Sequence, residues 1–266
     1  MTVVMGIVNT TPDSFSDGGQ HTGAASAIAH AQHLVAQGAA IIDVGGESTR
    51  PGADRVPAAE ELRRVLPVVE ELAAGGITVS VDTMRASTAR EAIRAGARIV
   101  NDVSGGLADP DMLGVVAEAG VDYVVMHWRS HSRTMQADAR YGDVVAEVRH
   151  EVVAARDAAL TAGVAAERII LDPGIGFSKD ADHNWELLRH LDRFTALGHR
   201  VLVGVSRKRF LGEALGGALP AARDVATAAV TAWCAQQGVW AVRTHEVPMQ
   251  VDAVAVGHRL APPTGR

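Results

Sequence analysis

The sequence predicts an α/β protein whose eight parallel strands close into a (β/α)8 barrel. Three observations predict this fold. Short apolar segments alternate with longer amphipathic ones eight times within 266 residues, which is the pattern of such a barrel. Several short segments, such as 201–203, are apolar throughout, as strands covered by helices on both faces are. The chain contains no G-x-G-x-x-G loop, which the alternative, an open doubly wound sheet, would favour after an early strand.

The eight strands are expected to be short and rich in Val, Ile, Leu and Ala. A polar stretch follows each of them, so each has a clear end. The strands are expected at residues 3–8, 40–44, 77–81, 98–100, 121–125, 168–171, 201–205 and 239–242.

The eight helices are expected where apolar side chains recur every three or four residues. In the second of them Leu62, Val65, Val69 and Leu72 fall on one face, and Gly75 ends the segment. The helices are expected at residues 24–37, 58–74, 86–95, 110–119, 143–162, 182–197, 221–237 and 247–260.

We expect a single domain over residues 1–266, with residues 261–266 as a frayed tail, because no linker or low-complexity segment divides the chain. The single cysteine, Cys234, excludes an internal disulfide framework and a multi-cysteine zinc site. Its apolar neighbours predict a buried thiol.

Charge and hydropathy exclude two classes of partner. A formal net charge of −6 argues against nucleic acid as a main partner, because phosphate binding needs a basic face. No apolar run approaches the roughly 18 residues that cross a membrane. The N-terminus lacks the basic segment of a signal peptide. These features predict a cytoplasmic enzyme.

Polar residues follow every expected strand, where a parallel barrel builds its active site. A single aspartate in such a place is more often the cap of the next helix, but the same bias at eight strand ends indicates a site. The strand ends carry Asn9, Asp43, Asp82, Asn101, His127, Asp172, Lys208 and Arg243.

The site residues form two chemical sets. Arg50, Lys208, Arg243 and His245 are cationic in a net acidic chain, which indicates a phosphorylated or carboxylated ligand. The second set comprises acceptors that suit a heterocycle edge with parallel N–H donors. This set contains Asp82, Asn101 and Asp172. The residues alone predict a transferase or lyase that handles an anionic leaving group and a nitrogen heterocycle.

Several motifs resemble those of a known family. Two are long: GIVNTTPDSFSDGG at 6–19 and GGESTRPG at 45–52. The others, in chain order, are DT at 82–83, NDVSGG at 101–106, DPGIGF at 172–177, SRK at 206–208 and RTH at 243–245. In these motifs the sequence resembles the dihydropteroate synthases, a family of (β/α)8 barrels.

The resemblance implies a reaction. Dihydropteroate synthases condense 6-hydroxymethyl-7,8-dihydropterin pyrophosphate with 4-aminobenzoate in folate biosynthesis, with Mg²⁺, and release 7,8-dihydropteroate and pyrophosphate. Loss of pyrophosphate ahead of attack would leave a cation on the pterin methylene. The neutral aniline is itself the nucleophile, so the protein needs no nucleophilic side chain.

The resemblance also implies how the pterin and the diphosphate bind. Asp172 and Asn101 would accept from the pterin amino group and ring N–H, Lys208 would donate to the ring and cover one face, and Met126 would pack on the other. Asp82 would stabilise the methylene cation. Asn9, Arg50, Arg243 and His245 would hold the diphosphate, and Asn9 would ligate Mg²⁺. The implied catalytic set is Asp82, Lys208, Arg243 and His245.

For the aminobenzoate, the resemblance implies a slot built by Phe15, Thr49, Pro51 and Phe177, with Ser206 and Arg209. The carboxylate would meet the start of a helix near 208–209. Arg209 stands where many relatives have serine, and it could bind the carboxylate or point to solvent. Glycines at 18–19, 45–46 and 52 make the first two loops candidate lids. A sulfonamide would mimic the aminobenzoate.

Two features stay outside this scheme. The chain has two lysines, Lys179 and Lys208, among many arginines, and only Lys208 receives a role. The loop after the fifth strand departs from the family at Ser130 and Ser132. It carries His127 and His131, which could be a metal pair, although packing or solvated histidines are favoured.

Two alternatives stay open. A pterin-dependent methyltransferase barrel shares the pterin-binding logic but has no reason to keep a diphosphate set. A non-catalytic pterin-binding paralogue would not turn over. A homodimer is expected from the resemblance.

Overall fold

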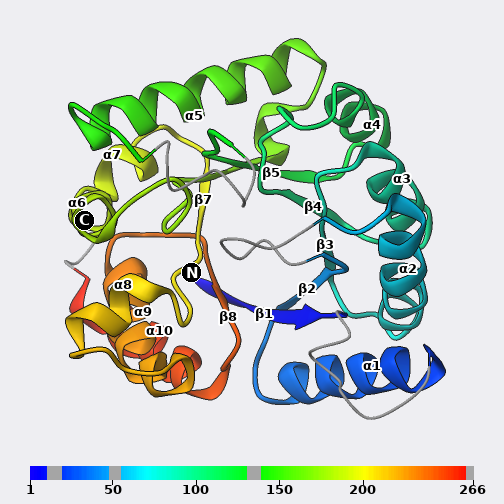
Figure 1. Ribbon diagram of the computed structural model, residues 1–266, viewed down its shortest axis with the longest axis horizontal. Coiled ribbons are helices and arrows are strands. Elements are labelled where there is room, and N and C mark those ends of the chain that lie inside the picture. The colour runs from blue at the N-terminus through cyan, green and yellow to red at the C-terminus, as the bar shows by residue number, and fades with distance from the viewer. Residues whose placement is uncertain (11–19, 48–54, 131–138, 262–266) are drawn as a thin grey trace.

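The computed structural model describes residues 1–10, 20–47, 55–130 and 139–261. Eight parallel strands form one closed barrel in chain order, and β8 pairs with β1 (Figure 1). The strands are β1 Val3–Asn9, β2 Ile41–Gly45, β3 Val79–Asp82, β4 Ile99–Asp102, β5 Asp122–Met126, β6 Ile169–Asp172, β7 Arg200–Val203 and β8 Ala241–Thr244. The predicted single-domain (β/α)8 barrel is confirmed.

Helices surround the barrel (Figure 1). The α-helices are α1 Gln20–Ala36, α2 Ala58–Ala74, α3 Ala86–Arg94, α4 Met112–Ala119, α5 Val144–Thr161, α6 Ala181–Arg189, α7 Asp192–Thr195, α8 Arg209–Ala214, α9 Asp224–Gln236 and α10 Pro248–Leu260. Two 3₁₀ turns, η2 Ala166–Arg168 and η3 Pro220–Arg223, precede β6 and α9.

The strands are buried on both faces, as their apolar sequences predicted. One face lines the barrel interior, where seven strands contribute Met5, Ile41, Ile99, Val124, Ile170, Leu202 and Ala241. The opposite face packs against the helices in the larger core, to which Val8, Val44, Val100 and Val125 belong.

Two differences from the predicted helices have local causes. The expected helix at 182–197 is two helices, because His190 leaves the helical region (φ −113°, ψ 32°). The change of direction lets Leu191 and Phe194 be fully buried. The expected helix at 221–237 starts later, after η3 with Pro220 in its first turn. The helix implied near 208–209 is α8.

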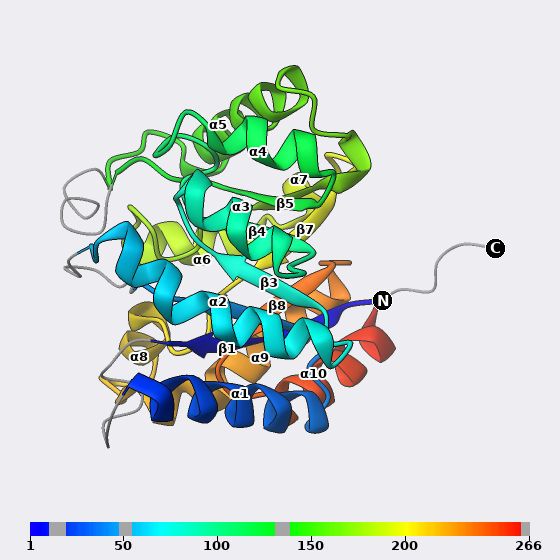
Figure 2. The same ribbon diagram turned by 90° about the vertical axis from the view of Figure 1, so that its right-hand side faces the viewer.

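The strand ends share one side of the barrel because all strands are parallel. In Figure 2 the β1 arrow points to the side where α8 lies, and the N-terminus lies on the other side. No helix in the described ranges is long and apolar enough to cross a membrane. Cys234 is fully buried, as predicted, and burial raises the pKa of its thiol to about 12.

Helices α9 and α10 approach closely at Gly257, where an added Cβ would overlap the carbonyl oxygen of Ala232. We expect Gly257→Ala to lower the free energy of unfolding by about 1–3 kcal/mol, because the two helices must separate. Denaturant unfolding measures this change. Gly114→Ala in α4 is the matched control, since a Cβ there meets no atom within 4 Å. It should be neutral or stabilising by up to about 1 kcal/mol. Equal stability of both variants would contradict this view of the contact.

Candidate active site

An arginine inside the barrel forms the centre of a charged cluster. Nε–H of Arg243, on β8, donates to Oδ2 of Asp43 on β2 at 2.6 Å, and Nη2 donates to Oδ2 of Asp82 on β3 at 2.7 Å. Nδ2 of Asn101, on β4, donates to the same Asp43 oxygen at 3.0 Å. The other Asp43 oxygen, Oδ1, is buried and has no hydrogen-bond partner within the described ranges. Four strands therefore meet in one polar cluster.

The alternation of side chains along the strands explains why these residues meet. Side chains two positions apart on a strand point to the same face. On five of the strands that line the barrel interior, the side chain two residues after the inner apolar residue also points inward, and these five side chains form the next layer. That layer contains Asp43, Asn101, Met126, Asp172 and Arg243. Asp82 and Asn101 are direct neighbours in the β3–β4 register.

Burial dominates the electrostatics of this cluster. It raises the pKa of Asp82 to about 7, with the Arg243 charge opposing the shift and the Asp43 charge adding to it. The contacts of Arg243 with Asp43 and Asp82 use two of the five guanidinium N–H donors. The remaining donors can bind an anion that enters the barrel mouth.

A second group of predicted residues lies around the ends of β5 and β6. Asp172 is buried, and its Oδ1 accepts from the backbone N–H of Gly174 at 2.7 Å. Burial raises its pKa, and the Lys208 charge opposes the shift. Met126 is buried in a small apolar cluster, against which Phe177 packs.

Lys208 joins this group from the β7–α8 loop. Its Nζ donates to the carbonyl oxygen of Ile175 and lies 4.6 Å from the centre of the Phe177 ring. Burial lowers its pKa to about 8, with Asp172 opposing the shift. Gly176 has φ 85°, and a Cβ there would come within 2.7 Å of Lys208 Cδ. A glycine is therefore required beside the lysine stem.

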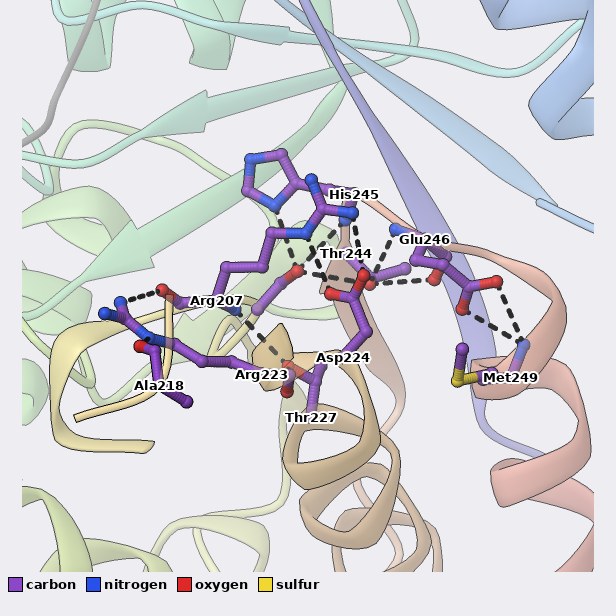
Figure 3. A network of polar contacts seen from close by, with 10 residues as sticks. Arg207, Ala218, Arg223, Asp224, Thr227, Thr244, His245, Glu246 and Met249 are labelled. Atoms are coloured by element: carbon purple, nitrogen blue, oxygen red, sulfur yellow. Dashed lines mark hydrogen bonds and ion pairs between the residues drawn. The ribbon is translucent and has the colours of Figure 1, made fainter. Parts of the chain in front are cut away.

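The β7–α8 loop is tied to β8 and α9, as Figure 3 shows. Ser206 Oγ lies 2.9 Å from Nδ1 of His245 and accepts from the His245 backbone N–H at 3.1 Å. Arg207 has φ 60° and donates from Nε and Nη2 to the two carboxylate oxygens of Asp224, both at 2.8 Å. Nη1 of Arg223 donates to the Arg207 carbonyl at 2.9 Å. These contacts hold Arg207, whose backbone is in the left-handed region, between Ser206 and Lys208.

The other predicted residues divide into two groups. Phe15, Thr49, Arg50 and Pro51 lie outside the described residues, as do most of the candidate lids at 10–19 and 49–55 and all but the first residue of the tail 261–266. Asn9, at the end of β1, is half-buried. Arg209 is exposed and its Nε lies 3.2 Å from Glu213 Oε1, an arrangement that agrees with the solvent-facing alternative.

Sequence reasoning placed Asp43 at a strand end but gave it no role, and it gave Lys179 no role either. A charged residue within the apolar β2 segment was the available signal for Asp43, because a buried carboxylate needs a partner. His127 is a packed, buried residue whose Nδ1 contacts Lys179, and His131 lies outside the described residues. Within the described ranges, three or more His, Cys, Asp or Glu side chains do not gather into a metal-binding group.

Comparisons with known proteins agree with this geometry. A family model described as pterin binding enzyme matches residues 5–245. A dihydropteroate synthase of Mycobacterium leprae is 53% identical over 259 residues, 95% of this chain and 91% of that one. This chain belongs to the dihydropteroate synthase family.

Solved structures of the family are similar along nearly the whole chain. The Xanthomonas albilineans dihydropteroate synthase with 4-aminobenzoic acid has a TM-score of 0.92 at 45% identity, covering 98% of this chain and 94% of that one. The same enzyme with 7,8-dihydropteroate has a TM-score of 0.88 at 43% identity, covering 98% and 95%. A Yersinia pestis synthase with a sulfonamide drug has a TM-score of 0.91 at 38% identity, covering 97% and 94%.

The Asp43 charge raises the pKa of Asp82, so Asp43→Asn should lower that pKa below about 7. A carbon-13 NMR titration of the Asp82 carboxyl measures the shift. Asp122→Asn, at the opposite end of the barrel, should leave it unchanged. An unaltered Asp82 titration in Asp43→Asn would show that the two carboxylates do not interact.

Proposed function

We propose that this chain is a dihydropteroate synthase, a transferase that condenses 6-hydroxymethyl-7,8-dihydropterin pyrophosphate with 4-aminobenzoate. The observation that carries the proposal is the arrangement of Asp172, Met126 and Lys208 around the ends of β5 and β6, with Arg243 close enough to act on the Asp172 charge. This arrangement offers a planar donor-rich ring a carboxylate, an apolar face and a cation, beside a guanidinium for an anion.

The pterin would bind between β4, β5, β6 and the β7–α8 loop. Asp172 would accept two parallel N–H donors from the ring, and Asn101 would supply a further polar contact. Met126 packs against one ring face. Lys208 would leave the Ile175 carbonyl to donate to the ring and cover the other face.

The diphosphate would lie at the barrel mouth near β1 and β8. Arg243 would use the N–H donors that Asp43 and Asp82 leave, and His245, oriented by Ser206, would contribute a second donor. Arg50 is the proposed partner from the second loop. A guanidinium already oriented by two carboxylates needs little reorganisation when charge develops on the leaving group.

Asn9 suits the predicted Mg²⁺ site. Mg²⁺ prefers oxygen ligands and keeps several waters, and protein commonly supplies one or two ligands beside substrate phosphates. Asn9 offers an amide oxygen at the end of β1, and its register partner Gly45 has no side chain to fill the adjacent space. When bound, Mg²⁺ would neutralise charge on the departing pyrophosphate.

The reaction then needs positioning and electrostatics. The bond between the pterin methylene and the pyrophosphate oxygen breaks, and the electron pair leaves with pyrophosphate. The Asp82 carboxylate stabilises the methylene cation. The aniline lone pair forms the new C–N bond, and its proton passes to pyrophosphate or water. Holding the two substrates in line supplies much of the rate.

The 4-aminobenzoate would lie against Phe177, with its carboxylate toward the start of α8. We propose Phe15, Thr49 and Pro51 as its partners on the first two loops, with Ser206 nearby. A sulfonamide would compete for this slot, as the Yersinia pestis complex suggests for a relative. The homodimer and the cytoplasmic location remain predictions.

The decisive test is pyrophosphate release from the pterin substrate with and without 4-aminobenzoate. Release that depends on 4-aminobenzoate separates the synthase from a non-catalytic paralogue and from a methyltransferase.

Asp172→Asn should weaken pterin binding at least about tenfold, because a buried donor then faces a donor. Calorimetric titration with a pterin measures this loss. Unchanged pterin affinity in that variant would overturn the assignment of Asp172.

The rate should depend on pH through Asp82. As pH falls through about 7 the carboxylate gains a proton and loses the charge that stabilises the cation, so kcat should fall. Asp82→Asn should lower kcat at every pH and remove this acid limb. Above about 8, deprotonation of Lys208 should lower pterin affinity in both proteins. An acid limb that persists in Asp82→Asn would assign it to another group.

A further inference from the structure

Lys179, the lysine without a role in the proposed reaction, is buried behind the site with 2% of its surface exposed. Its Nζ has three acceptors. They are Nδ1 of His127 at 2.8 Å, the carbonyl oxygen of Gly174 at 3.0 Å and that of Phe177 at 2.9 Å. Three acceptors match the three N–H donors of an ammonium group.

The histidine in this group has a defined proton position. Nε2 of His127 lies 2.9 Å from Oε2 of Glu151. Burial alone would raise the pKa of Glu151, but hydrogen bonds from His127 and Arg129 outweigh burial and lower this pKa to about 2. The carboxylate therefore accepts from Nε2–H, which leaves the Nδ1 lone pair to accept from Lys179. Burial and the Lys179 charge lower the pKa of His127 to about 4, so the ring is neutral.

The lysine contacts a loop whose carbonyls accept from side chains as well as from its own backbone, where Phe177 N–H donates to the Gly174 carbonyl at 3.0 Å. Residues 174–178, between β6 and α6, have left-handed backbone at Gly174 (φ 65°), Gly176 (φ 85°) and Ser178 (φ 48°). Side chains supply further donors to this loop. Lys179 donates to two of its carbonyls, and Tyr141 Oη donates to the Ser178 carbonyl at 2.9 Å. The loop conformation therefore depends on donors from outside it.

The same loop carries the substrate-facing groups. Gly174 N–H donates to the Asp172 carboxylate, and Lys208 donates to the Ile175 carbonyl of the same loop. Both lysines therefore donate to carbonyls of the 174–178 loop in this structure, and Lys179 is the one that would stay in place when the pterin binds.

On the basis of the proposed synthase function, we propose that Lys179 is a positioning residue. Its ammonium group, oriented by the His127–Glu151 pair, holds the 174–178 loop from behind. Phe177 then faces the aminobenzoate, and the Asp172 carboxylate stays charged for the pterin. Lys179 touches neither substrate and acts through these two residues.

The positive charge of Lys179 has an effect on Asp172 that is separate from the hydrogen bonds that Lys179 makes. The positive charges of Lys208 and Lys179 both oppose the burial that raises the pKa of Asp172. Burial lowers the pKa of Lys179 well below its usual value, the charges of Lys208 and Arg129 add to this shift, and the charges of Asp172 and Glu151 oppose it. Removing the Lys179 charge should therefore raise the pKa of Asp172 and shift the acid limit of pterin binding to higher pH.

Lys179→Met in the full chain tests this proposal, since methionine keeps the length of the side chain without its charge. Arg200→Met is the matched control, because it removes a paired cation, bonded to Asp122 at 2.7 Å, from the amino-terminal end of the barrel. Pterin Kd between pH 5 and 8, and kcat and KM for 4-aminobenzoate, are measured for both variants.

Lys179→Met should raise the pterin Kd and the aminobenzoate KM about tenfold or more, the effect of leaving buried acceptors unpaired. It should also move the acid limit of pterin binding to higher pH. The control should show neither change. A variant that loses folded protein but keeps wild-type KM and acid limit would overturn the proposal. An inactive wild-type chain would instead contradict the synthase function.

A second measurement needs no substrate. Because the chain has two lysines, carbon-13 labelling at lysine Cε gives two side-chain signals, and the Lys208→Met spectrum assigns the remaining one to Lys179. We expect Lys179 to show the shift of an ammonium group at pH 7. The shift of a neutral amine would overturn the proposal even if Lys179→Met did not fold.

Discussion

The pairing of Arg243 with Asp43 and Asp82 is the interaction on which the rest of the site depends. A guanidinium and two carboxylates inside a barrel lose hydration, and that cost is offset only by close, well-aligned contacts. The 2.6 and 2.7 Å distances supply such contacts. Removing one partner of a buried pair costs about 3–5 kcal/mol. The pairing also orients the arginine and opposes the burial that raises the pKa of Asp82, so it couples the proposed diphosphate end of the site to the proposed methylene end.

Two irregular loops complete the site, and both are held from outside. Arg207, with its left-handed backbone, is held by Asp224 and Arg223, which directs Ser206 and Lys208 from either side of it. The 174–178 loop is held by Lys179 and Lys208. Backbone in such conformations persists only where the surroundings over-determine it. The ion pairs and buried donors around these loops therefore contribute to the geometry of the site more than to its chemistry.

Much of the fold could be predicted, since strand and helix periods are local properties. The apolar segments predicted all eight strands within two residues at most ends, and helix 58–74 coincides with α2. The break at His190 could not be predicted, because it depends on the burial of Leu191 and Phe194 against distant elements. The polar strand ends predicted which end of the barrel holds the site. In the structure Asn101 faces the interior, whereas its neighbour Asp102 accepts from the backbone of Ser104 and Gly106 and from the hydroxyl of Tyr123.

The sequence by itself determined the barrel, the family and the identity of the cationic and acceptor residues, because these follow from local patterning and from motifs. The tertiary structure alone decided their partners. Asp43 and Arg243 are 200 residues apart, and nothing in either segment indicates that closing the barrel brings β2 and β8 within reach of each other. Lys179 and His127 likewise come from different strand ends, 52 residues apart. A buried charge indicates that a partner must exist, but only the closed barrel determines which residue that partner is.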